Sequence, residues 1–161
     1  MKKLLGMVMV LGLVLGLGRV AMAGDTATLN VSATVNGTCK FSALNASLTL
    51  ANDGLGAIDP SVNTAATGST TIAYRCTKGT PATGVTAGNG DHFSGNRRVG
   101  LGDHSDYMAY SLTLSGGTQT GTGFGAGQDK TLDISGTILV ADFQNATAGV
   151  YDDHVTLTIT P

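Results

Sequence analysis

Residues 27–35 read ATLNVSATV, and this stretch decides the fold class. Its apolar residues occupy every second position, and Thr, Asn or Ser stands between them. Such alternation places the apolar side chains on one face of a β-strand and the polar side chains on the other. The segment therefore predicts a two-faced strand close to the start of a β-sheet domain.

Further stretches along the chain predict strands on the same grounds. They are the segments 47–50, 70–76, 85–87, 106–115, 131–140 and 155–160. In the segment 131–140, Gly136 is expected to mark a bulge or the close approach of another backbone. Glu is absent and no stretch after residue 24 keeps a 3.6-residue apolar period, so helices are not expected. About seven short strands joined by turn-rich segments predict an all-β sandwich.

The residues before this pattern have the composition of a secretory signal peptide. Two lysines are followed by an apolar run over residues 4–17 and a small-x-small triplet at 21–23. Cleavage is therefore expected before Gly24, with residues 1–23 as the signal peptide. The alternative is a membrane anchor, but the run is shorter than the roughly 20 residues that span a bilayer, and Arg19 ends it.

Removal of 23 of the 161 residues leaves 138, enough for one domain with a core. That part keeps six basic residues against 11 acidic ones, all Asp, which excludes the basic footprint of a nucleic-acid-binding protein. Cys39 and Cys76 are the two cysteines of the chain. In an exported protein such a pair predicts a disulfide rather than two buried thiols.

The two ends of the predicted domain also indicate that it could associate with another subunit. The last predicted strand ends at Pro161, so no later strand is available to pair with its open edge. The first predicted strand is joined to Cys39 only through residues 36–38. An exposed apolar edge promotes association. Two interpretations follow: the N-terminal strand packs in its own domain, or it completes the sheet of a neighbouring subunit by β-strand addition.

Four segments, taken in chain order, resemble the spore coat protein U domain family. They are VSATVNGTC at 31–39, IAYRCTKGTP at 72–81 with Ala-Gly at 87–88, Arg-Arg at 97–98 with MAYSL at 108–112, and AGVYDD at 148–153 with VTLTI at 155–159. The ordered set covers most of the chain after residue 23. The family includes the subunits of archaic (Csu-type) chaperone–usher pili. It usually ends in an aromatic residue, whereas this chain ends Thr160-Pro161.

The resemblance implies an incomplete immunoglobulin-like β-sandwich at residues 37–161, preceded by a donor strand at 24–36. A periplasmic chaperone would lend a strand to the open acceptor groove, and an outer-membrane usher would exchange it for the donor strand of the next subunit. Carried onto this sequence, the donor side chains are Leu29, Val31, Ala33 and Val35. The residues implied for the acceptor groove are Val155, Leu157 and Ile159.

The function implied is that of a non-enzymatic structural subunit, exported to the periplasm and then to the cell surface. It would bind copies of itself or related pilins and polymerise into a pilus, fimbria or coat that supports adhesion and biofilm formation. The alternative that stays open is a self-contained, secreted β-sandwich that acts as a coat or binding protein without polymerising.

No nucleotide, metal or catalytic site is predicted as strongly as the role of a structural subunit. The glycines of 121–127 suggest a phosphate loop, but they open no helix and lack the Lys-Ser/Thr of a Walker loop. Asp91-His92 and the segment 103–106 would bind a divalent metal only if they met in space, and they lack regular ligand spacing. A Gly-x-Ser-x-Gly elbow is also missing. We therefore expect no metal, no cofactor and no catalytic residue.

Overall fold

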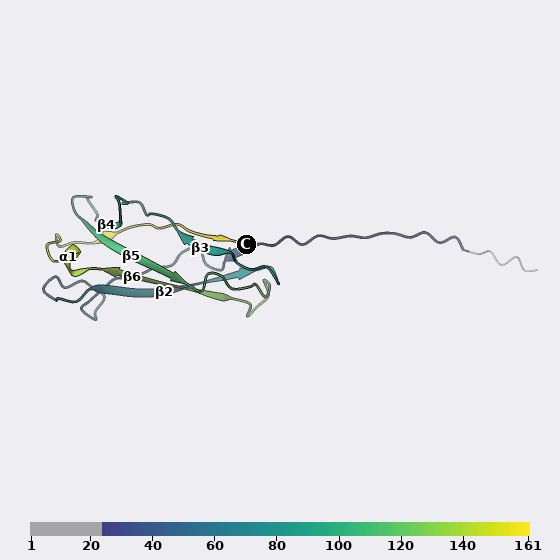
Figure 1. The fold of residues 1–161 in the computed structure, drawn as a ribbon, viewed down its shortest axis with the longest axis horizontal. Coiled ribbons are helices and arrows are strands. Elements are labelled where there is room, and N and C mark those ends of the chain that lie inside the picture. The colour runs from purple at the N-terminus through teal and green to yellow at the C-terminus, as the bar shows by residue number, and fades with distance from the viewer. Residues whose placement is uncertain (1–23) are drawn as a thin grey trace, which may run out of the picture. The chain divides into compact units, whose positions relative to one another are not determined.

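The computed structural model describes residues 24–161, so the expected signal peptide at 1–23 lies outside the described residues. The chain divides into two units, Met1–Thr34 and Val35–Pro161, and each is described by itself. In the first unit, the described residues 24–34 belong to no strand and are exposed. They follow an extended path (Figure 1).

The second unit is a sandwich of two antiparallel sheets of unequal size (Figure 1). The larger sheet has six strands in the order β1 (Cys39–Phe41), β2 (Ala66–Cys76), β6 (Lys130–Ile138), β5 (Tyr107–Ser115), β4 (Arg97–Leu101) and β7 (Tyr151–Asp152). The smaller sheet pairs β3 (Gly84–Ala87) with β8 (Leu157–Thr160), and one short helix, α1 (Val140–Phe143), follows β6. The prediction of an all-β, incomplete immunoglobulin-like β-sandwich is confirmed.

The core lies between the two sheets because the long strands alternate as their sequences predict. On β2 and β6 every second residue is buried, including Ile72, Tyr74, Leu132 and Ile134. The smaller sheet contributes Val85, Leu157 and Ile159 to the same cluster. A second cluster at the other end contains Ala66, Met108, Ile138 and Phe143. The larger sheet therefore supplies most of the buried surface.

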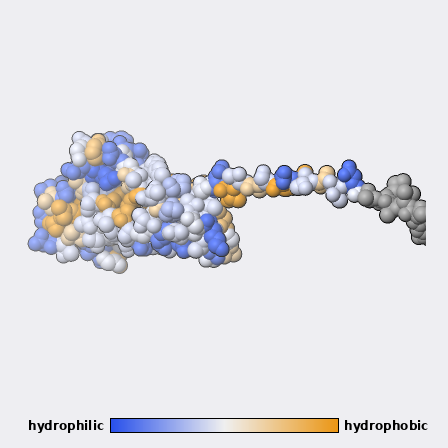
Figure 2. Space-filling view, turned by 45° about the vertical axis from the view of Figure 1, so that its right-hand side comes forward, coloured by the Kyte–Doolittle hydropathy of each residue, from blue (hydrophilic) through white to orange (hydrophobic). Residues whose placement is uncertain are grey.

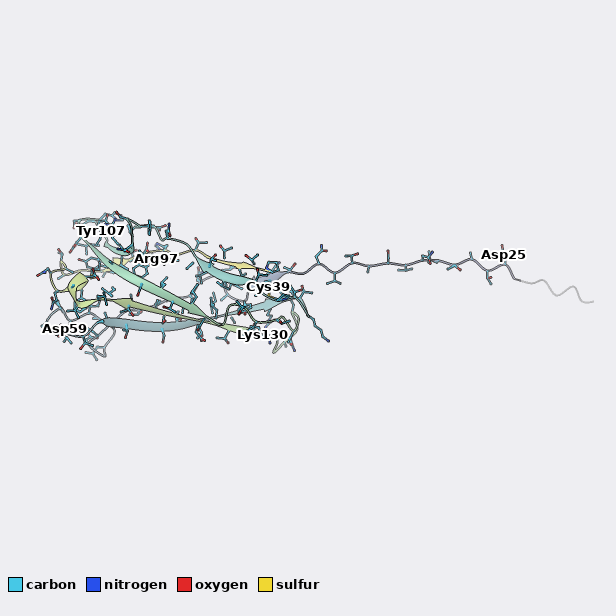
Figure 3. All side chains as sticks on the ribbon, in the orientation of Figure 1. Asp25, Cys39, Asp59, Arg97, Tyr107 and Lys130 are labelled. Carbon is cyan, nitrogen blue, oxygen red and sulfur yellow. A yellow bond between two sulfur atoms is a disulfide. The ribbon has the colours of Figure 1, made fainter. Side chains whose placement is uncertain are left out.

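The predicted disulfide between Cys39 and Cys76 is present. The two residues are direct partners in the antiparallel ladder of β1 and β2, with Cα atoms 4.1 Å apart. Cys39, labelled in Figure 3, is the first residue of β1. Beside it, the buried Tyr74 hydroxyl donates to the Gly116 carbonyl oxygen at 2.7 Å. The disulfide thus ties β1 covalently to β2, and the Tyr74 bond ties β2 to the residue after β5.

The expected strand at 47–50 is wrong, and two glycines show why. Gly68 and Gly136 are partners on β2 and β6, on the face that points into the core. A Cβ at Gly68 would collide with the Thr49 carbonyl oxygen, and one at Gly136 would lie 2.9 Å from Leu50 Cδ2. Residues 48–50 therefore lie against the sheet face instead of extending an edge, and Ala51 alone bridges to β2. At Gly136 the approach comes from leucine side chains, and the close backbone approach expected there occurs at its partner Gly68 instead.

Other elements also differ from the expectation: β2 begins at Ala66 rather than residue 70, and β1 and β7 were not expected as strands. The strand expected at 131–140 ends at Ile138, and Val140 begins α1. Strand β4, with the sequence RRVGL, shows no apolar alternation and was not expected as a strand. Residues 27–35 pair with no strand in the described part of the chain.

Loss of the disulfide is expected to destabilise the domain without changing its fold. In the chain-entropy model, opening the loop in a Cys39→Ala, Cys76→Ala double variant lowers the free energy of unfolding by roughly 4 kcal/mol. Urea unfolding followed by far-UV circular dichroism measures the loss. The wild-type protein in reductant is the matched control and should unfold with the double variant. A loss below about 1 kcal/mol would show that the bond contributes little to stability.

Candidate functional site

The extended N-terminal segment presents a row of uncovered apolar side chains. Leu29, Val31 and Val35 are 85%, 84% and 81% exposed, and Ala33 is also exposed. Figure 2 shows apolar residues spaced along this segment. Large apolar side chains at this exposure, on a backbone without strand partners, are typical of an interaction element.

The junction between this segment and the sandwich is fixed by Thr77. Its backbone N–H donates to the Thr38 carbonyl oxygen at 2.9 Å, and its hydroxyl donates to the Asn36 carbonyl oxygen at 3.2 Å. The Thr38 N–H donates to the Thr77 hydroxyl at 3.1 Å. These bonds continue the β1–β2 ladder beyond the Cys39–Cys76 pair. Residues 36–38 are therefore held in line with β1.

The smaller sheet leaves one edge of β8 unpaired. Strand β8 pairs with β3 through Val85–Ile159 and Ala87–Leu157, and with no other strand among the described residues. Leu157 and Ile159 point toward the first core cluster but stay only half-buried. Val155, the third residue expected here, is half-buried and precedes the strand. An edge strand with apolar inward side chains is a template for a further strand.

Strand β1 lies next to this free edge. It is the terminal strand of the larger sheet and lies close to β8. Phe41 on β1 and Leu48 in the connection between β1 and β2 pack on the same cluster as Leu157. Both are likewise only half-buried. We call the free edge of β8, together with the neighbouring β1 and Leu48, the open edge. Phe41 and Leu48 were not expected from the sequence because residues 41–48 have no alternation.

A buried carboxylate fixes the chain just before β8. The Asp153 side chain is 2% exposed and accepts hydrogen bonds from the backbone N–H of Asp91 at 2.7 Å and the Tyr110 hydroxyl at 2.6 Å. Burial, reinforced by this bond to Asp153, raises the pKa of Tyr110. A Cβ at Gly90 would collide with the same carboxylate. The start of the last strand is thus anchored to two other parts of the fold.

A second carboxylate, Asp106, anchors the segment around β7. Its Oδ2 accepts from the Thr147 backbone N–H at 2.7 Å and from the Tyr151 hydroxyl at 2.8 Å, and its Oδ1 accepts from the Tyr107 N–H. These bonds, with Thr147 as the largest contribution, lower the pKa of Asp106 to about 2. Hydrogen bonds to the ionised form have this effect because they stabilise the charge.

The Gly-rich segment and the two Asp/His segments, considered above as nucleotide and metal sites, lie outside the strands. The Gly-rich segment is a loop between β5 and β6, with Gly121 N–H bonded to the Thr80 carbonyl oxygen at 2.8 Å and Gly123 N–H to that of Cys76 at 3.0 Å. The two Asp/His segments do meet, through His92 and His104. Within residues 24–161, no three metal-binding side chains gather in one place, and no helix has the length and apolarity to cross a membrane.

The model of the Spore Coat Protein U domain matches residues 25–158 of the chain. The chain belongs to the Spore Coat Protein U domain family. The match includes both the extended N-terminal segment and nearly all of the sandwich up to β8. The family expected from the four sequence segments is therefore confirmed.

Among solved structures, one similar chain comes from a structure described as “Chaperone-tip adhesin complex is vital for synergistic activation of CFA/I fimbriae biogenesis”. It is 16% identical, with a TM-score of 0.44, and the similarity covers 78% of this chain and 41% of that one. This chain thus spans less than half of that protein, and similarity of this degree has no bearing on function. No curated protein matches the chain.

The carboxylate at Asp106 predicts a particular pH dependence. Its folded pKa of about 2 lies below the unfolded value near 3.9, so its contribution to stability is present above about pH 4 and lost as the pH falls toward 2. Asp106→Asn should therefore be less stable at neutral pH and lose less stability between pH 4 and 2. Thermal melts across this window measure both effects. Asp25→Asn, in the exposed segment, should keep the wild-type slope, and an equal slope for Asp106→Asn would contradict the assignment.

Proposed function

We propose that this protein is an exported structural subunit that polymerises by donating its N-terminal strand, residues 24–36, to the open edge of another subunit. The observation that carries the proposal is the coexistence, within residues 24–161, of an alternating segment without a strand partner and a strand, β8, with one edge unpaired. Membership of the Spore Coat Protein U domain family supports a structural rather than an enzymatic role.

The chemistry of the two parts is complementary. The donor side chains Leu29, Val31, Ala33 and Val35 alternate with polar residues, so they would all face the core of a sandwich that received the segment. The acceptor residues Val155, Leu157 and Ile159 are half-buried and would gain cover from them. Burial of each Leu or Val contributes on the order of 1.5–3 kcal/mol. Backbone hydrogen bonds along β8 would add to this and fix the register.

The linker favours donation to a neighbour over insertion into the same domain. A segment that turned back to lie beside its own β1 would need residues 36–38 to form the turn. Those residues are held in line with β1 by Thr77, which bonds the carbonyl oxygens of Asn36 and Thr38. Folding back would break these bonds, whereas extension into another subunit keeps them.

The assembly that fits this arrangement is a pilus, fimbria or surface coat that supports adhesion and biofilm formation. Before assembly the open edge needs a temporary partner, since an exposed edge strand aggregates. A periplasmic chaperone would supply that partner and an outer-membrane usher would exchange it for the next subunit's donor segment. A signal peptide at 1–23 is consistent with this route. The competing function is a monomeric secreted coat or binding protein.

Substitutions on the two faces of the donor segment separate these functions. Leu29→Asp with Val31→Asp places two charges where burial is required, and should reduce SDS-resistant ladders of the protein lacking residues 1–23 by at least about tenfold. The matched control, Asn30→Asp with Ser32→Asp, adds the same charge to the polar face of the same segment. The control should form ladders as the wild type does.

Gel electrophoresis without boiling reads out the ladders, and circular dichroism checks that both variants are folded. Polymerisation of the Leu29→Asp, Val31→Asp variant at the wild-type level would contradict the donor role. A wild-type protein that stays monomeric at high concentration, with and without a chaperone partner, would favour the self-contained coat protein.

A further inference from the structure

Two histidines from different loops meet at one end of the sandwich. His92 lies between β3 and β4, and His104 lies in the turn between β4 and β5. Nε2 of His92 is 3.0 Å from Nδ1 of His104, and their ring planes are inclined at 45°. Two imidazole nitrogens at this distance are joined either by one shared proton or by a cation that both coordinate.

The His92 ring is held in place from several sides. Its side chain is 13% exposed, and its Nδ1 faces an oxygen of the nearly buried Asp153 carboxylate at 3.4 Å. The carbonyl oxygen of His92 accepts from Arg98 Nε at 2.9 Å. A Cβ at Gly100 would lie 3.2 Å from two carbons of the ring, so the ring occupies the space that this glycine leaves. The position of Nε2 is thus set by the fold before any ligand arrives.

The arrangement of Asp153, His92 and His104 has the features of a metal site. A metal-binding histidine commonly has its second ring nitrogen oriented by a carboxylate. Nδ1 of His92 is buried without a hydrogen-bond partner among the described residues, and the oxygen of Asp153 faces it at the ion-pair distance of 3.4 Å. With metal–nitrogen bonds of about 2.0–2.1 Å, the two nitrogens lie about 2.9 Å apart at a right angle and about 3.3 Å apart in a tetrahedron. The observed 3.0 Å falls within this interval.

We propose that His92 Nε2 and His104 Nδ1 bind one divalent transition-metal ion, with Asp153 as the carboxylate that orients His92. Imidazole ligands favour Zn²⁺, Ni²⁺ or Cu²⁺ over Ca²⁺ or Mg²⁺. No third metal-binding side chain joins them within residues 24–161, so water completes the coordination. His104 is exposed, which leaves that side open to solvent.

The site would couple three connections of the sandwich. His92 belongs to the β3–β4 connection, His104 to the β4–β5 turn and Asp153 to the link between β7 and β8. The same end carries Tyr107, labelled in Figure 3, whose ring lies under the Arg98 guanidinium at 4.3 Å. A bound metal ion would stiffen the chain four residues before β8. This inference does not depend on strand donation.

Calorimetric titration of the protein lacking residues 1–23 with ZnCl₂ and with NiCl₂ tests the proposal. The wild type should bind one equivalent and melt at a higher temperature with the metal present. His104→Asn removes the imidazole and should weaken binding at least about tenfold, since loss of even an outer-shell partner of a ligand commonly costs that much. Asn suits the left-handed backbone of residue 104, where φ is 58°, so this variant should fold.

The third histidine provides the matched control. The side chain of His154, the residue after Asp153, is 79% exposed, and its Nδ1 lies 3.2 Å from Asp91 Oδ2. His154→Ala should bind zinc and nickel as the wild type does. The proposal is overturned if the wild type binds neither metal, if His104→Asn binds with wild-type affinity, or if His154→Ala loses binding to the same extent as His104→Asn.

Discussion

The smaller sheet of the sandwich contains two strands, and the free edge of β8 is the constraint on which the rest of the structure depends. Backbone N–H and C=O groups along that edge have no strand partner in the described chain, and Leu157 and Ile159 beneath them are only half-buried. Unpaired backbone groups along such an edge are a template for a further strand. The N-terminal segment is the reverse case, because it has large apolar side chains that are exposed and pack in no core among the described residues.

The remaining features keep this unfinished edge in a defined shape. The Cys39–Cys76 bond ties β1 to β2, so the neighbour of β8 does not detach while the edge is open. Asp106 and Asp153 fix the chain that leads into β8 through backbone and tyrosine donors. The proposed metal pair would act on the same connection. These contacts therefore hold both the strand next to the open edge and the chain that leads into β8.

Much of this fold is predictable from the sequence because its long strands alternate. Alternation located β2, β5, β6 and β8, and the cysteine count located the disulfide. The segment 47–50 also has strand-like residues, but the inner-face glycines Gly68 and Gly136 draw its backbone onto the sheet. Strand β4 has no alternation, and its pairing with β5 decides its state. Both outcomes depend on contacts that are distant in sequence.

The residues of the candidate site were likewise only partly predictable from the sequence. The donor residues and those of β8 carry a local pattern, whereas Phe41 and Leu48 at the open edge do not. Asp153 binds Asp91 and Tyr110, which are far away along the chain. Polar contacts between loops leave no periodic signal. The family model matches both the N-terminal segment and the start of β8, because its match runs from residue 25 to residue 158.

Hydrogen exchange of monomer and polymer, followed by mass spectrometry, tests the central claim most directly. If the N-terminal segment of one subunit completes the sandwich of the next, amides of residues 27–35 and those on the free edge of β8 should exchange rapidly in the monomer and become protected together in the polymer. Amides of β2 and β6 should be protected in both states. Protection of residues 27–35 already in the monomer, or their continued rapid exchange in the polymer, would contradict the account.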